Sequence, residues 1–277
     1  YALIALGYTM VYGIIKLINF AHCDVYMIGA YVGYACMTFL HLGFAVSLCA
    51  AMLVCMVLGV IIEKVAYKPL RNATRIAVLI TAIGVSYLLE YGMMYFVKAN
   101  VRTYPAMTGL MAKTFQFGGV TVSMLQVLIV AITVVLMIAL QLIVKKTRIG
   151  KAMRATAQNR KMAMLLGIDA DRIISLTFII GSSLAAIGGV LIANHVGQVN
   201  FFIGFIAGIK AFTAAVLGGI GSIPGAMVGG LVLGLCESFA TGYISSAYED
   251  ALAFALLVLI LIFRPAGILG KPKVQKV

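Results

Sequence analysis

Charged residues are scarce in this chain of 277 residues. Asp, Glu, Lys and Arg make up 10% of it, whereas hydrophobic residues make up 63% and the mean hydropathy is +1.11. A soluble globular domain carries about a quarter charged residues. A surface this poor in charge would not be wetted by water, which excludes an ordinary soluble domain and indicates that lipid is the solvent.

Acidic residues and tryptophan are also in short supply. The chain has 8 acidic residues against 21 basic ones, and Trp is absent, so any aromatic belt has to come from Tyr and Phe. A net charge of +13 would suggest a nucleic-acid partner if the protein were soluble. Here the excess lies in loops, where membrane orientation explains it, and no nucleic-acid partner is expected.

The sequence lacks the motifs of catalysis and cofactor binding. It contains no G-x-x-x-x-G-K-[ST] phosphate loop, no nucleophile elbow and no zinc-ligand spacing. The five cysteines have neither disulfide nor metal-ligand spacing, and they are expected to be packed thiols. We therefore expect no enzyme activity, no cofactor and no metal in this chain.

Long apolar runs dominate what is present. A membrane-spanning helix needs about 20 mostly apolar residues. The clearest candidate covers 124–144, which contains no charged residue. The expected fold class is an all-α polytopic membrane protein with about eight or nine transmembrane helices or half-helices. The candidate runs are 1–15, 24–40, 45–63, 76–97, 124–144, 173–193, 203–220, 224–241 and 250–264.

Lysine and arginine gather on one side of this predicted bundle. The 64–75 loop has four of them, the 145–172 loop has eight and the tail from Arg264 has four. The loops at 194–202 and 241–249 have none. The positive-inside rule places the basic side in the cytoplasm, as expected of a multi-pass protein of a bacterial inner membrane.

Glycine and proline interrupt the late apolar runs. The segment 221–225 (GSIPG) separates 203–220 from 224–241, and these two runs are expected either as full spans or as half-helices that meet there. Small residues let helix backbones approach closely in lipid. The residues predicted to pack helices or to form a hinge are Gly218, Gly219, Gly221, Pro224 and Gly225.

The basic loop at 145–172 contains a helix-forming segment. From Ala152 to Leu166 neither Pro nor Gly interrupts residues that favour a helix, and Gly167 can end it. The next helix starts near Arg172, with Asp169 or Asp171 as its cap. The residues expected on the apolar face of the loop helix are Met153, Ala157, Met164 and Leu165.

This amphipathic helix has two interpretations. It is either a basic linker lying on anionic lipid or a docking element for a cytoplasmic partner. In the second interpretation, the residues expected to contact the partner are Arg154, Ala155, Ala157, Gln158, Lys161, Met162, Leu165 and Gly167.

Several charged or polar residues fall inside or at the ends of predicted spans. Lys210, Glu90 and Glu237 would each cost about 2.5–3.5 kcal/mol at a helix centre, so they are expected to face protein or water. Either they line the translocation path and meet a zwitterionic solute, or Lys210 pairs with an acid and holds helices together, or the charged groups snorkel to a membrane interface. Asn19 and His22 belong either to the same path or to a turn at the membrane interface.

Short segments along the whole chain resemble one protein family. They are 3–13 (LIALGYTMVYG), 18–22 (INFAH), 25–31 (VYMIGAY), 161–168 (KMAMLLGI), 210–230 (KAFTAAVLGGIGSIPGAMVGG) and 264–270 (RPAGILG). In this order they are similar to the LivH-type permeases of branched-chain amino-acid ABC importers. The segment 154–157 (RATA), with Gly167 downstream, is similar to the coupling loop of ABC importer permeases. The family often has Gly where Cys23 stands.

The resemblance implies a single transmembrane permease domain over 1–277, with further residues upstream of the position that matches Tyr1. It also implies partners. They are two ATP-binding-cassette subunits that hydrolyse ATP with Mg, a second related permease subunit or copy, a periplasmic or extracellular amino-acid-binding protein, and membrane lipid.

The function implied by the resemblance is translocation of leucine, isoleucine and valine, driven by ATP hydrolysed in partner subunits. Two alternatives stay open. One is a permease of the same architecture for urea or short amides. The other is an ion-coupled secondary transporter that works alone, with Glu90, Glu237 and Asp24 as the available coupling acids.

Overall fold

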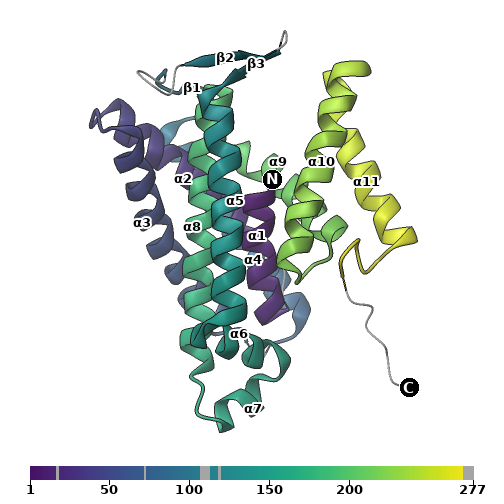
Figure 1. The fold of residues 1–277 in the computed structure, drawn as a ribbon. Helices are drawn as coiled ribbons and strands as arrows, with labels where there is room; N and C mark the ends of the chain where they lie inside the picture. Colours follow the sequence, from purple (N-terminus) through teal and green to yellow (C-terminus); the bar gives the residue numbers. More distant parts are fainter. Residues whose placement is uncertain (17–18, 72, 107–112, 118–119, 271–277) are drawn as a thin grey trace.

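The computed structural model describes residues 1–16, 19–71, 73–106, 113–117 and 120–270 (Figure 1). Within these residues the chain is predominantly helical, as predicted. The main helices are α1 (Ala2–Ile15), α2 (Ala21–Thr38), α3 (Phe44–Ile62), α4 (Arg75–Val97), α5 (Met124–Lys146), α8 (Ala170–Val196), α9 (Ile203–Gly218), α10 (Ile223–Tyr243) and α11 (Glu249–Phe263).

Six helices in the described part of the chain are long and apolar enough to cross a membrane. They cover Phe44–Tyr67, Ile76–Val97, Met124–Lys146, Ala170–Val196, Ile223–Tyr243 and Ser246–Phe263. α1 and α9 are shorter apolar helices. The chain is thus a multi-pass membrane protein, and each of the nine predicted runs corresponds to one helix.

Connections between these helices gather at two ends of the bundle (Figure 1). At one end, β1 (Arg102–Thr103) pairs antiparallel with β4 (Gln198–Val199), and β2 (Thr114–Phe117) pairs with β3 (Val120–Ser123). We call this the strand end. The opposite end carries α6 (Arg148–Gln158), α7 (Arg160–Leu165) and the turn between α9 and α10, and we call it the loop end.

α8 forms the centre of the bundle. In its most apolar window 72% of the residues are buried, against 6% in α5, whose side chains are left for lipid or a partner. Glycine allows this close packing, because a Cβ at Gly189 would lie 2.2 Å from the carbonyl oxygen of Tyr26 on α2. α1, α2 and α3 pack around α8.

Local sequence explains where the long helices begin. Ser123 and Gln126 form a capping box that starts α5, and the Asp169 carboxylate accepts from the amides of Asp171 and Arg172 at the start of α8. Ser222 caps α10, with proline in the first turn. Of the two caps predicted for this helix, Asp169 is confirmed, and Asp171 lies in the first turn of α8.

The last turn of α3 widens into a π-helix, η1 (Glu63–Tyr67). The amide of Lys68 donates to the carbonyl of Glu63 at 2.7 Å, five residues back. Such π-turns are rare, and many of them lie at functional sites. This one places Glu63 and Tyr67, both buried, toward the interior at the loop end.

At the strand end one tyrosine fixes the loop that follows α4. Tyr104 is buried, and its hydroxyl donates to the carbonyl of Ala30 on α2 at 2.9 Å. Burial raises the pKa of this hydroxyl above its usual value. The neutral phenol therefore ties the loop to the bundle.

Candidate functional site

The basic loop folds into two helices rather than one. Asn159 has an extended backbone (φ −154°, ψ 106°), and its side chain accepts a hydrogen bond from the Met162 amide at 3.1 Å. It thus ends α6 and caps α7, because an asparagine side chain satisfies a free amide better at a helix start than within a helix. The prediction of an uninterrupted helix from Ala152 to Leu166 is wrong.

The end of α7 follows the prediction. Gly167 has φ 80°, a conformation in which glycine avoids the strain of a side chain. The Ile168 amide donates to the carbonyl of Ala163, and the Gly167 amide donates to that of Met164. These bonds satisfy carbonyls that the helix end would otherwise leave free.

The break at Asn159 divides the predicted apolar face. Met153 on α6 is buried, whereas Leu165 and Leu166 are 81% and 78% exposed. Met162 is also largely exposed. We call Met162, Leu165 and Leu166 the α7 tip; exposed Lys161 lies beside it. A soluble surface rarely leaves leucines so uncovered, so the α7 tip has the character of a contact surface.

α6 packs against α1, α5 and α8. Arg154 and Ala157 share the wall of a small cavity of about 130 Å³ with Gly221 of that turn. The Arg154 guanidinium donates to the carbonyls of Val144 and Lys145 at 3.0 and 3.2 Å, and so caps the end of α5. Two of the predicted loop residues therefore line the same cavity as one residue of the predicted glycine hinge. Ala155 is half-buried on α6, and Gln158 is exposed at its end.

A cluster of charged side chains lies beside α7 at the loop end. The Arg71 guanidinium donates to the carboxylates of Glu63 and Asp171. Asp171 also accepts from Arg160 of α7 at 2.9 Å, and Glu63 accepts from the Ser175 hydroxyl at 2.7 Å. We call Glu63, Arg71, Arg160 and Asp171 the loop-end cluster. It joins η1, α7 and α8.

Burial makes this cluster a firm connection. The side chains of Glu63 and Arg71 are 0% and 7% exposed. Removing either partner would leave the other charge buried without compensation. The pairing of these residues could not be predicted from the sequence, because Asp171 lies 100 positions from Arg71 and no local pattern relates them.

A second cluster lies toward the strand end. Lys210 on α9 forms ion pairs with Glu237 on α10 at 3.4 Å and with Asp250 on α11 at 2.9 Å. It also donates to the Glu249 carboxylate. We call Lys210, Glu237, Glu249 and Asp250 the strand-end cluster. Lys210 thus connects three helices, as in the interpretation that pairs it with an acid.

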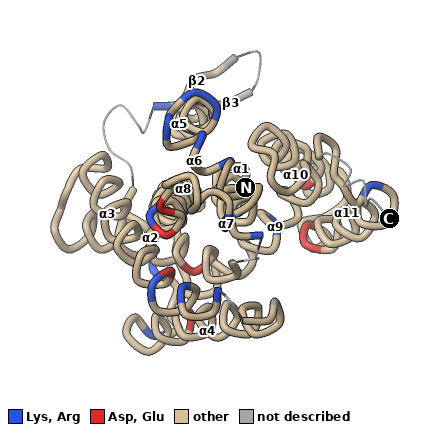
Figure 2. Tube along the Cα trace, turned by 90° about the horizontal axis from the view of Figure 1, so that it is seen from below, with Lys and Arg blue, Asp and Glu red and all other residues tan. Residues whose placement is uncertain are grey.

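Figure 2, which views the bundle from the loop end, shows that charged residues are not spread evenly. Basic and acidic segments lie side by side next to α2 and α8, and a separate acidic segment lies at α11. The apolar helices between them carry little charge. The two clusters are therefore separate features of the molecule.

The structure places Asn19 and His22 at helix contacts. Asn19 is buried, and its side-chain oxygen accepts from the Tyr67 hydroxyl of η1 at 2.8 Å. His22 is buried against α1, where a Cβ at Gly7 would lie 2.2 Å from its Nε2 atom. Neither residue lies next to Lys210 or Glu237 in these contacts.

Glycines let α9 and α10 pack backbone to backbone. A Cβ at Gly218 would lie 1.8 Å from the carbonyl oxygen of Gly225, and a Cβ at Gly229 would lie 2.0 Å from that of Ala214. Gly219 and Gly221 turn the chain at φ 104° and 95°. Pro224 lies in the first turn of α10. The predicted glycine segment therefore closes a tight antiparallel pair.

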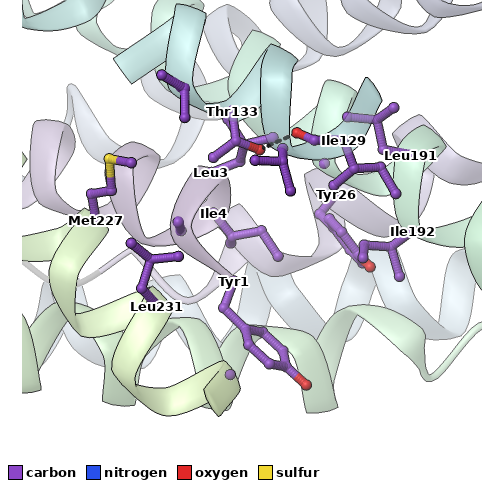
Figure 3. A pocket seen from close by; sticks show the side chains of 16 residues that line it. Tyr1, Leu3, Ile4, Tyr26, Ile129, Thr133, Leu191, Ile192, Met227 and Leu231 are labelled. Atoms are coloured by element: carbon purple, nitrogen blue, oxygen red, sulfur yellow. Dashed lines mark hydrogen bonds between the residues drawn. The ribbon is translucent and has the colours of Figure 1, made fainter. Parts of the chain in front are cut away.

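A pocket of about 260 Å³ opens between α1, α5, α8 and α10 (Figure 3). Its wall is almost entirely apolar, with Ile4, Ile129 and Leu231 among its residues. The Thr133 hydroxyl donates to the Ile129 carbonyl at 2.7 Å, so its hydrogen is already used (Figure 3). Such a wall favours an apolar occupant over a charged one.

Comparison with known proteins supplies the family. The family described as branched-chain amino acid transport system permease component matches residues 1–261. BraD, a high-affinity branched-chain amino acid transport permease protein of Pseudomonas aeruginosa, is 48% identical over 290 residues, which cover 100% of this chain and 94% of BraD. LivH of Escherichia coli K12, with the same description, is 46% identical over 288 residues, which cover 100% and 93%.

A more distant relative is the probable branched-chain amino acid transport permease protein LivH of Methanocaldococcus jannaschii. It is 28% identical over 285 residues, which cover 97% of this chain and 88% of that protein. No solved structure matches the chain. Since the likeness to BraD and LivH runs through every helix described above, the chain belongs to the family of branched-chain amino acid transport system permease components.

Proposed function

We propose that this chain is the membrane-spanning permease subunit of an ABC importer and that it translocates leucine, isoleucine and valine. The observation that carries the proposal is the full-length identity of 46–48% to BraD and LivH. The many apolar helices agree with such a role, because a solute path through lipid has to be enclosed by protein.

The proposed arrangement is one transmembrane domain over 1–277, with eight or nine spans in the bacterial inner membrane and the loop end in the cytoplasm. The eight basic residues of the 145–172 loop support this orientation. α1, α2 and α9 are not among the six long apolar helices, and in the proposed arrangement they complete the bundle as further spans.

The proposed partners follow the expectation from sequence. Two ATP-binding-cassette subunits hydrolyse ATP with Mg, a second permease subunit or copy completes the path, and an extracellular binding protein delivers the solute. Lipid covers the remaining apolar surface. The chain itself has no ATPase site, no cofactor and no nucleic-acid partner in this proposal.

The α7 tip is the proposed contact for the ATPase subunit. Its exposed apolar side chains beside Lys161 suit a groove on a partner. Movement of the tip reaches the spans through Arg160, which binds Asp171 at the start of α8, while Arg154 ties α6 to the end of α5. Rigid-body tilting of these helices would alternate access to the path.

The first experiment tests the transport function. The complete transporter in proteoliposomes is expected to accumulate radiolabelled leucine when ATP is present, and unlabelled isoleucine and valine are expected to compete. Competition by urea instead would favour the permease for urea or short amides. Accumulation under an ion gradient without ATPase subunits would overturn the proposal in favour of a secondary transporter.

The second experiment tests the contact at the α7 tip. When this chain is used to capture the ATPase subunit, Leu165→Asp is expected to abolish the capture, since it places a carboxylate in an apolar contact. Leu40→Asp is the matched control, because Leu40 is an exposed leucine at the strand end. Equal capture by both variants would place the ATPase contact elsewhere.

A further inference from the structure

A second, chemically different cavity lies between α1, α2, α4 and α9. It has a volume of about 290 Å³, and five aromatic residues line it: Tyr8, Phe20, Tyr87, Phe205 and Phe212. The rings of Tyr8 and Phe212 meet edge to face, with centroids 6.2 Å apart. Ile83 and Tyr87 on the α4 wall are 37% and 50% exposed, so the cavity is open at that side.

One polar group on this wall has a fixed role. The Ser86 hydroxyl, which lines the cavity, donates its hydrogen to the Asp24 carboxylate at 2.5 Å. A serine hydroxyl has one hydrogen and two lone pairs. Once the hydrogen is engaged, Ser86 can offer an occupant of the cavity only an acceptor, and so it favours a ligand that donates.

The charge behind Ser86 points the same way. Asp24 and Glu90 are 1% and 2% exposed, and Glu90 lies one helical turn from Ser86 on α4. Among the described residues, neither acid takes part in an ion pair. Burial without a basic partner disfavours the charged forms of these acids, and a cation bound nearby would offset that cost.

We propose that this cavity binds the transported amino acid, with its ammonium group at Ser86, which is bonded to the buried Asp24 carboxylate behind it, and its branched side chain among the aromatic rings. The inference rests on the proposed function. It assigns solute contact to α2, α4 and α9, and not to Lys210 and Glu237, whose charges are used in holding helices together. In the apolar pocket of Figure 3 the Thr133 hydroxyl also has its hydrogen engaged, but its partner is a backbone carbonyl and not a carboxylate.

The test uses a thiol reagent on the complete transporter without nucleotide or binding protein. Ile83→Cys, in a chain whose native cysteines are replaced by alanine, places one thiol on the cavity wall. Millimolar leucine is expected to slow its modification. 4-Methylpentanoate, which keeps the branched chain but lacks the ammonium group, is expected not to. Ile80→Cys is the control, because Ile80 lies on α4 but outside the cavity lining and is 63% exposed.

A second variant tests the polar contact. Ser86→Ala in the Ile83→Cys chain is expected to raise the leucine concentration needed for half protection about tenfold, because a hydrogen bond to a charged group is lost. Ser86→Thr keeps the hydroxyl and is expected to retain protection.

Three results would overturn the inference. They are the absence of leucine protection at position 83 in a transporter that still takes up leucine with ATP, equal protection at position 80, and equal protection by 4-methylpentanoate. Each leaves the proposed function standing, because ATP-driven uptake is measured on the same sample.

Discussion

The two charge clusters differ in how their charges balance. The loop-end cluster sets two arginines, together with the more exposed Lys68, against two carboxylates, and its central pair is almost completely buried. The strand-end cluster sets one lysine against three carboxylates, two of which are well exposed. The difference indicates that the loop-end cluster acts as a fixed joint, whereas the strand-end cluster is partly hydrated and can exchange partners.

The largest effect on stability is expected from breaking the buried Glu63–Arg71 ion pair. Arg71→Gln leaves the Glu63 carboxylate, which is 0% exposed, without its cationic partner. We expect a loss of about 3–5 kcal/mol in the free energy of unfolding, measured by denaturation in detergent micelles.

The matched control is Lys68→Gln, which removes a more exposed partner of Asp171. A surface ion pair is worth about 0–1 kcal/mol, so its loss is expected to be small. If the two variants lost the same free energy of unfolding, the buried Glu63–Arg71 pair would contribute no more than a surface ion pair.

A smaller effect is expected at the strand end. Lys210→Met leaves Glu237 without its cation, but water can rehydrate Glu249 and Asp250, so the expected loss is about 2 kcal/mol in the same assay. Adding Glu237→Gln is expected to recover part of it, because the uncompensated buried charge is then removed. No recovery would show that Lys210 acts mainly through the exposed acids.

The smallest effect on stability is expected at Asp250, an exposed member of the strand-end cluster. Asp250 is 58% exposed, and Asp250→Asn is expected to cost less than about 1 kcal/mol. Leucine uptake is expected to stay near that of the unchanged protein. A larger loss than that of Lys210→Met would make Asp250 the main partner and reverse the order of the comparison.

The helices could be predicted because each is encoded locally. The run at 124–144 became α5, since an uncharged segment of that length has few alternatives in lipid. Asp169 could be identified as a cap because its side chain acts on amides two and three residues away.

The arrangement of the site could not be predicted in the same way. Arg71 meets Asp171 only because α8 packs beside η1, and that packing is a property of the whole bundle. The break at Asn159 occurs because its side chain accepts a hydrogen bond from the Met162 amide and so starts a new helix. Helix propensities alone do not predict whether such a residue caps a helix or continues one. The partners of Lys210 likewise depend on where α11 begins.

The wide turn at η1 has a consequence for how this protein tolerates changes in length. The Lys68 amide bonds to a carbonyl five residues back instead of four, so this turn holds one residue more than an α-turn. Deleting one residue between 64 and 66 would let the segment close as an ordinary α-turn, with Tyr67 still directed toward Asn19. A change of one residue in length is therefore better tolerated here than within α8, where it would rotate all later side chains by about 100° around the helix axis.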